Sequence, residues 1–128
     1  MLLHVCVGLT VIGTYLLLLL LSSCPLIFSS TPTPPLHRFL AEKKRDGYAV
    51  LGLEQSTNSV CITQFTFPAR AVILLGKEKE GVPAHLLQML DYCVEIPQFG
   101  VTRSLNVHVS GAIMVWEYTK QRMADGAI

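Results

Sequence analysis

The sequence predicts an α/β fold with a mainly parallel sheet. Three short, largely apolar runs, at residues 48–53, 71–75 and 93–96, have the length and composition of buried strands. Helical patterns precede, separate and follow these runs, and strands that alternate with helices are typical of layered folds with parallel strands. Residues 61–67 give a less clear pattern: Ile62, Phe65 and Phe67 are apolar, but Pro68 ends any regular element there.

Two short helices are predicted ahead of the last element. Residues 36–46 place apolar side chains on one side and a run of charged side chains on the other, and Gly47 ends the pattern. Pro83 opens a second helix at 83–90, where the missing N–H of proline leaves no intrahelical hydrogen bond unmade. With the three strands and the last helix, these two helices give the order helix, strand, strand, helix, strand, helix.

The last helix has the strongest apolar pattern in the chain. Ser104 is its expected N-cap, since a serine hydroxyl can accept a hydrogen bond from a first-turn amide. Five residues at helical spacing predict its buried face, and apolar residues on the other sides predict burial nearly all round. Those five are Leu105, Val109, Ala112, Ile113 and Trp116. Within such a helix, His108 is expected to be a hydrogen-bonded core histidine, whereas His37 and His85 look exposed.

The composition excludes few functions, but the distribution of charged residues divides the chain into an uncharged N-terminal part and a charged remainder. The 128 residues carry a formal charge of +1, which gives no strong signal for nucleic-acid or membrane-surface binding. No Asp, Glu, Lys or Arg precedes Arg38. The four cysteines are scattered without a C-x-x-C pair, so we expect small buried thiols and no metal site or disulfide.

The first thirty residues differ from everything that follows. Residues 2–28 form an uncharged, leucine-rich run long enough to span a bilayer, so a membrane or secretory route is one interpretation. An unnatural start and a buried apolar segment are the two others. We therefore divide the chain into an apolar segment at 1–30, a Pro-rich connector at 31–35 and a folded part at 36–128.

Candidate functional residues gather where strands are expected to end. In open α/β sheets, ligands bind beyond the carboxyl ends of the strands. Three loops, at 54–59, 76–83 and 97–104, fall there and converge if their strands are neighbours. A glycine that directly follows a strand, such as Gly76, lets a ligand approach the backbone or simply makes a turn. Arg103 could bind phosphate or be merely exposed. No Ser/His/Asp arrangement, phosphate-binding loop or metal spacing supports a hydrolase or NTPase.

Two blocks of sequence carry a resemblance to a known family. Residues 74–83 read Leu-Leu-Gly-Lys-Glu-Lys-Glu-Gly-Val-Pro, which resembles the second motif of the SpoU/TrmH branch of the SPOUT methyltransferases. Residues 96–100 (Ile-Pro-Gln-Phe-Gly) followed by 104–112 (Ser-Leu-Asn-Val-His-Val-Ser-Gly-Ala) resemble the third. Within the branch, the chain from residue 34 onward is most similar to the catalytic tail of animal TAR-RNA-binding-protein-like tRNA (guanosine-2′-O)-methyltransferases.

The resemblance implies a partial SPOUT (α/β knot) domain with a C-terminal trefoil knot that binds S-adenosyl-L-methionine. The implied reaction transfers the sulfonium methyl to a ribose 2′-hydroxyl of a D-loop guanosine in tRNA. By motif position, Gly76, Gly81, Ile96 and Leu105 would bind the cofactor. Glu78, Ser104 and Asn106 would be the catalytic residues, and Arg103 would contact RNA.

The resemblance also implies a homodimer packed through the last helix, where residues 110–112 would allow close backbone approach, and a cytoplasmic or nuclear protein. The family's first motif, an asparagine followed at helical distance by an arginine, has no counterpart upstream of Tyr48. We therefore expect this chain alone to be weakly active or inactive. The alternatives are a catalytically inactive module that binds cofactor or RNA, and a membrane-anchored protein of other function.

Overall fold

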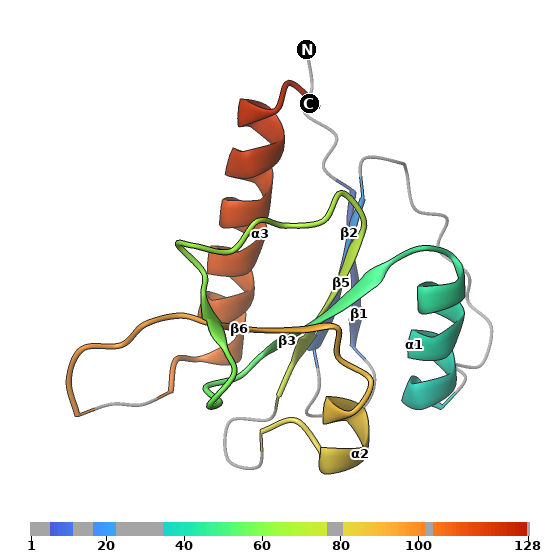
Figure 1. Ribbon diagram of the computed structural model, residues 1–128, viewed down its shortest axis with the longest axis horizontal. Coiled ribbons are helices and arrows are strands. Elements are labelled where there is room, and N and C mark those ends of the chain that lie inside the picture. The colour runs from blue at the N-terminus through green and yellow to red at the C-terminus, as the bar shows by residue number, and fades with distance from the viewer. Residues whose placement is uncertain (1–5, 12–16, 23–34, 77–80, 102–103, 128) are drawn as a thin grey trace.

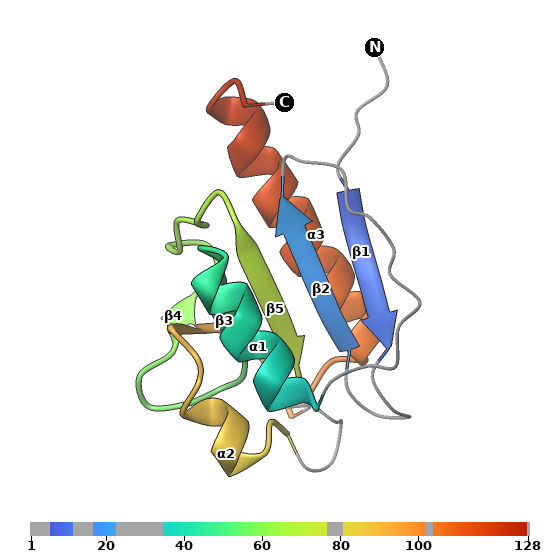
Figure 2. The same cartoon turned by 90° about the vertical axis from the view of Figure 1, so that its right-hand side faces the viewer.

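A six-stranded mixed sheet forms the centre of the structure, which is a computed structural model (Figure 1). The structure describes residues 6–11, 17–22, 35–76, 81–101 and 104–127. The strand order is β1-β2-β5-β3-β6-β4. Helix α3 covers one face of this sheet, and α1 and α2 lie on the other side, as the two views show (Figures 1 and 2).

The parallel part of the sheet contains the strands that the sequence predicts. Strand β3 (Ala49–Leu53) pairs in parallel with β5 (Ala71–Leu75) on one side and with β6 (Tyr92–Glu95) on the other. All three confirm the predicted strands to within a few residues. A further two-residue strand, β4 (Val60–Cys61), pairs in parallel with the end of β6 and was not predicted.

Strand β5 is buried on both faces, as an internal parallel strand requires. Ala71, Ile73 and Leu75 pack with Met114 and Tyr118 in the core beneath α3. Val72 and Leu74 point to the opposite face of the sheet, where a second core forms. That second core also contains Leu40, Tyr48, Val50, Val82 and Leu86.

Helix α1 (Leu36–Arg45) confirms the helix predicted at 36–46, but α2 (Ala84–Leu87) is only four residues long. Beyond α2 the chain continues in tight turns, because the amides of Met89 and Leu90 each bond to the carbonyl three residues earlier. The Leu90 side chain lies directly against Gly52, where an added Cβ would be 2.3 Å from Leu90 Cδ1. The prediction of a longer helix at 83–90 was therefore wrong, since Leu90 turns inward onto β3.

Helix α3 (Val107–Ala124) begins two residues later than a Ser104 cap would give, so that prediction was also wrong. The N-cap is Asn106, whose Oδ1 accepts a hydrogen bond of 2.9 Å from the amide of His108. The Asn106 side chain thus accepts the first-turn hydrogen bond that was expected of the Ser104 hydroxyl. His108 itself is exposed, which corrects the expectation of a core histidine.

The buried face of α3 is the opposite of the predicted one. Ser110, Gly111, Met114 and Tyr118 face the sheet, whereas Val109 is 49 % and Trp116 64 % exposed. At 100° per residue the two sets lie on roughly opposite sides of the helix. Apolar residues occur on both sides, so periodicity alone did not identify the side that packs against the chain, and the prediction of burial nearly all round was wrong.

Part of the N-terminal apolar segment lies in the sheet. Strands β1 (Cys6–Val11) and β2 (Leu17–Ser22) pair antiparallel with each other, and β2 pairs antiparallel with β5. Among the described residues, no helix is both long enough and apolar enough to cross a membrane. The three interpretations of residues 1–30 stay predictions.

Candidate functional site

The three predicted loops leave the same edge of the sheet. Strands β5, β3 and β6 are parallel neighbours, so their carboxyl ends at Leu75, Leu53 and Glu95 lie side by side. The loops that follow these ends span residues 54–59, 76–83 and 96–106, of which the structure describes all but 77–80 and 102–103. This arrangement is the one that places ligands in α/β proteins.

The loop after β5 closes on itself through two glycines. A Cβ added at Gly76 would lie 2.6 Å from the carbonyl carbon of Gly81 and 2.7 Å from the Val82 nitrogen. Gly81 has a φ of +66°, in the left-handed region that glycine adopts without steric cost. Glycine is therefore needed at both positions for the backbone at residues 81–82 to pack directly against the backbone at residue 76. Glu78 belongs to residues 77–80, which are outside the described part of the chain, so its predicted role stays a prediction.

Glu54 connects this turn to the ends of the two neighbouring strands. Its Oε2 accepts a hydrogen bond of 3.2 Å from the amide of Val82. Its own amide donates to the Val94 carbonyl of β6 at 3.1 Å, and its carbonyl accepts a contact from Cys93 Sγ at 3.4 Å. The sequence analysis placed Glu54 only in a polar loop. The signal that could have revealed it is a single acidic residue immediately after a buried strand.

The loop after β6 brings Ile96 and Leu105 to the same edge. Both are partly buried, and Ile96 packs against the core beneath α3. Among the described residues, no backbone hydrogen bond outside the helices and strand ladders involves Gly76, Ile96 or Leu105. Within the described part of the chain their amides and carbonyls thus have no such partner, and groups of this kind need partners when a ligand excludes water from them.

Ser104 and Asn106 flank the start of α3. The Asn106 Oδ1 is occupied as the helix cap, which leaves its Nδ2 to donate elsewhere. Ser104 is exposed. Arg103 lies outside the described residues, so its predicted contact with RNA stays a prediction.

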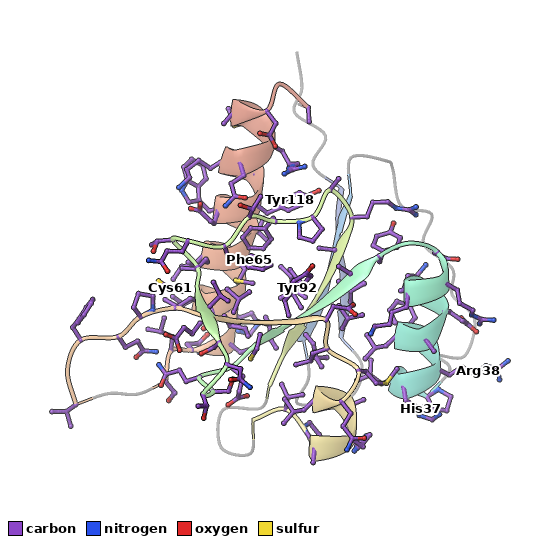
Figure 3. All side chains as sticks on the ribbon, viewed as in Figure 1. His37, Arg38, Cys61, Phe65, Tyr92 and Tyr118 are labelled. Atoms are coloured by element: carbon purple, nitrogen blue, oxygen red, sulfur yellow. The ribbon has the colours of Figure 1, made fainter. Side chains whose placement is uncertain are left out.

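Other polar groups order the rim of this edge. Ser59 Oγ donates to the Glu95 carboxylate and holds the loop after β3 against the end of β6. Cys61 and Cys93 are free and partly buried. In Figure 3, His37 and Arg38 lie on the outer side of α1, and His37 is exposed as predicted.

Comparison with solved structures gives the class of the fold. The TrmH/SpoU tRNA modifying enzyme of Aquifex aeolicus matches with a TM-score of 0.64 and 28% identity, over 74% of this chain and 48% of that one. An AdoMet-bound rRNA methyltransferase from Sinorhizobium meliloti matches with a TM-score of 0.60 and 26% identity, over 66% and 32% of the two chains. The fold and its carboxyl-edge site thus define a SPOUT-class methyltransferase domain.

The chain belongs to the SpoU rRNA Methylase family, whose sequence model matches residues 28–116. A mouse tRNA (guanosine(18)-2′-O)-methyltransferase, TARBP1, is 54% identical over 88 residues, or 69% of this chain. The tRNA (guanosine(18)-2′-O)-methyltransferase of Escherichia coli K12 is 32% identical over 87 residues, or 68% of this chain. The chain spans 6% of the mouse relative and 38% of the bacterial one.

Proposed function

We propose that residues 36–128 form the S-adenosyl-L-methionine-binding part of a tRNA (guanosine-2′-O)-methyltransferase. The observation that carries this proposal is the shared edge at which the described parts of the loops after β5 and β6 lie. There Gly76 lies against Gly81, and among the described residues no loop hydrogen bond engages the backbone of Gly76, Ile96 or Leu105. Family membership and the printed activities of the mouse and bacterial relatives support the choice of cofactor and of tRNA as substrate.

The residues present fit a purine nucleoside with a charged tail. Gly76 leaves no room for a side chain beside Gly81, so the ligand would meet bare backbone there. Ile96 and Leu105 combine partly buried apolar side chains with backbone groups that have no loop hydrogen bond to another described residue, which suits the flat face and polar edge of adenine. Gly76, Gly81, Ile96 and Leu105 would hold the cofactor, which supplies an activated methyl group on its sulfonium sulfur.

The chain's own residues would position the substrate hydroxyl. A ribose 2′-hydroxyl is a poor nucleophile unless a neighbouring group accepts its proton, and methyl transfer needs the reacting atoms held in line. Asn106 can donate from Nδ2 to RNA while its Oδ1 caps α3, and the exposed Ser104 hydroxyl lies two residues before it. Glu78 and Arg103 complete the proposed set.

We further propose that the protein forms a homodimer through the exposed side of α3. Four apolar or small residues at helical spacing form a stripe there: Val109, Ala112, Trp116 and Met123. Exposed stripes of this kind are typical of interaction surfaces. Ser110 and Gly111 are buried against the chain itself, so the expected close approach through 110–112 would involve Ala112 alone. The trefoil knot also stays a prediction.

Two experiments test the proposed function. Calorimetric titration with S-adenosyl-L-methionine should give saturable binding, and a folded chain that gives no heat with the ligand in excess would overturn the proposal. A tritiated-methyl transfer assay on tRNA then separates an enzyme from a cofactor-binding module. Turnover would place the activity in these 128 residues, and binding without turnover would support the inactive-module alternative.

A further inference from the structure

Glu54 occupies a junction that no motif describes. It is the first residue after β3, and backbone and thiol contacts to Val94 and Cys93 fix its main chain to β6. Its side chain extends the other way, toward the loop that follows β5. One residue therefore connects the carboxyl ends of three neighbouring strands.

The carboxylate contacts the closing point of the glycine turn. Besides the bond from Oε2 to the Val82 amide, both carboxylate oxygens lie close to Gly81, at 3.0 and 3.2 Å from the position of an added Cβ. Gly81 therefore accommodates the carboxylate as well as the positive φ.

Val82 is held from two sides. Its side chain is buried in the core between the sheet and the helices α1 and α2, where it packs with Leu74 and Leu86. Its amide is held by Glu54. The core contact holds the Val82 side chain against the sheet. The Glu54 bond orients the Val82 amide, whose nitrogen lies next to Gly76.

The geometry points to Glu54 as a positioning residue that, through the Val82 amide, holds the described end of the glycine turn, Gly81 and Val82, beside Gly76 for cofactor binding. This inference rests on the proposed function, because it takes that turn as part of the cofactor site. Glu54 acts on the backbone of the turn, so its effect depends on the reach of an acceptor oxygen and does not require a negative charge.

Three substitutions separate reach from charge. Glu54→Gln keeps an acceptor oxygen at the same reach and removes the charge. Glu54→Asp keeps the charge and shortens the side chain by one methylene, and Glu54→Ala removes both. Glu42→Ala is the matched control, since it removes an acidic side chain from the surface of α1, away from this edge.

Two readouts are measured on each variant: the Kd for S-adenosyl-L-methionine by calorimetry, and the hydrogen-exchange rate and shift of the Val82 amide by NMR. We expect Glu54→Ala and Glu54→Asp to weaken cofactor binding about tenfold and to speed exchange at Val82. Glu54→Gln and Glu42→Ala should stay within about twofold of wild type in both readouts.

Two results would overturn the inference. One is wild-type cofactor affinity in Glu54→Ala. The other is a Glu54→Gln variant that loses affinity while its Val82 amide stays protected, since the charge and not the turn would then matter. A wild-type chain that binds no cofactor would instead refute the proposed function, and the Val82 exchange rates would still show whether Glu54 holds the turn.

Discussion

The hydroxyl of Tyr118 on α3 donates a hydrogen bond of 2.6 Å to the backbone carbonyl of Ala69, just ahead of β5. Gln121, one turn further along, bonds the same segment twice, from Nε2 to the Phe65 carbonyl and through Oε1 to the Phe67 amide. Phe65 and Tyr118 lie together beside α3 in Figure 3. These bonds set the rotation of α3 and therefore the side that it exposes.

Replacing Tyr118 with phenylalanine tests this contact. The variant keeps the ring that packs edge-on against Phe67 but leaves the Ala69 carbonyl without its donor. We expect the free energy of unfolding in urea to fall by about 1 kcal/mol. Tyr92→Phe, at a half-exposed ring, is the control and should change stability little. Equal losses in the two variants would contradict the role given to Tyr118.

Alkaline pH should weaken the Tyr118 contribution in a predictable direction. Burial raises the pKa of the Tyr118 phenol above its ordinary value of 10.0, although the nearby Arg122 acts in the opposite sense. The folded state thus favours the neutral phenol, and its stabilising effect is complete below pH 10 and is lost as the pH rises through the higher folded-state pKa. The stability gap between wild type and Tyr118→Phe should therefore shrink as the pH rises above the ordinary phenol pKa of 10.0. A constant gap would show that the folded-state pKa is not raised.

Asp91 should matter more than the ion pair that it forms. Its Oδ2 accepts from the Val50 amide and its own amide donates to the Val50 carbonyl, both at 2.8 Å, while Oδ1 contacts Lys44 Nζ. We expect Asp91→Ala to cost about 1–3 kcal/mol, because the Val50 amide loses its acceptor. Lys44→Ala breaks only a half-exposed pair and should cost less than about 1 kcal/mol. Chemical denaturation of both variants measures the difference, and the reverse order of losses would contradict this account.

Substitutions of Asn106 separate its structural role from its proposed RNA contact. Asn106→Ala removes the α3 cap and should cost about 1 kcal/mol of stability. Asn106→Asp keeps an acceptor for the His108 amide but lacks the Nδ2 donor. We therefore expect thermal stability near wild type and weaker tRNA binding in a filter assay at fixed salt. Unchanged tRNA binding in Asn106→Asp would remove Nδ2 from the proposed site.

Some of these features could be predicted from the sequence and others could not. The strand β5 could be, because five successive apolar residues beside turn residues suit only a position buried on both faces. The orientation of α3 could not, since Val109 and Trp116 are as apolar as the residues that face the sheet. Only distant polar bonds, such as that from Tyr118 to Ala69, select the buried side.

The candidate site, too, could be predicted from the sequence only in part. The convergence of the three loops could be predicted on the condition that their strands are neighbours, which the pairing of β3 with β5 and β6 fulfils. The contact between Glu54 and Val82 spans 28 residues and depends on the order of strands, which local patterns do not encode. Strand β4 was missed for the same reason, since two residues become a strand only through pairing with β6.

The most direct test of the central claim is an NMR titration of the 15N-labelled chain with S-adenosyl-L-methionine, in parallel with the Gly76→Ala variant. An added Cβ at Gly76 would collide with the backbone of Gly81 and Val82. Glu42→Ala, which shortens a partly exposed side chain on α1, serves as the control. We predict saturable shifts at the amides of Gly76, Gly81, Ile96 and Leu105 in wild type and in Glu42→Ala, and their loss in Gly76→Ala. Shifts that are absent from these four amides, or that persist unchanged in Gly76→Ala, would contradict a cofactor site at this edge of the sheet.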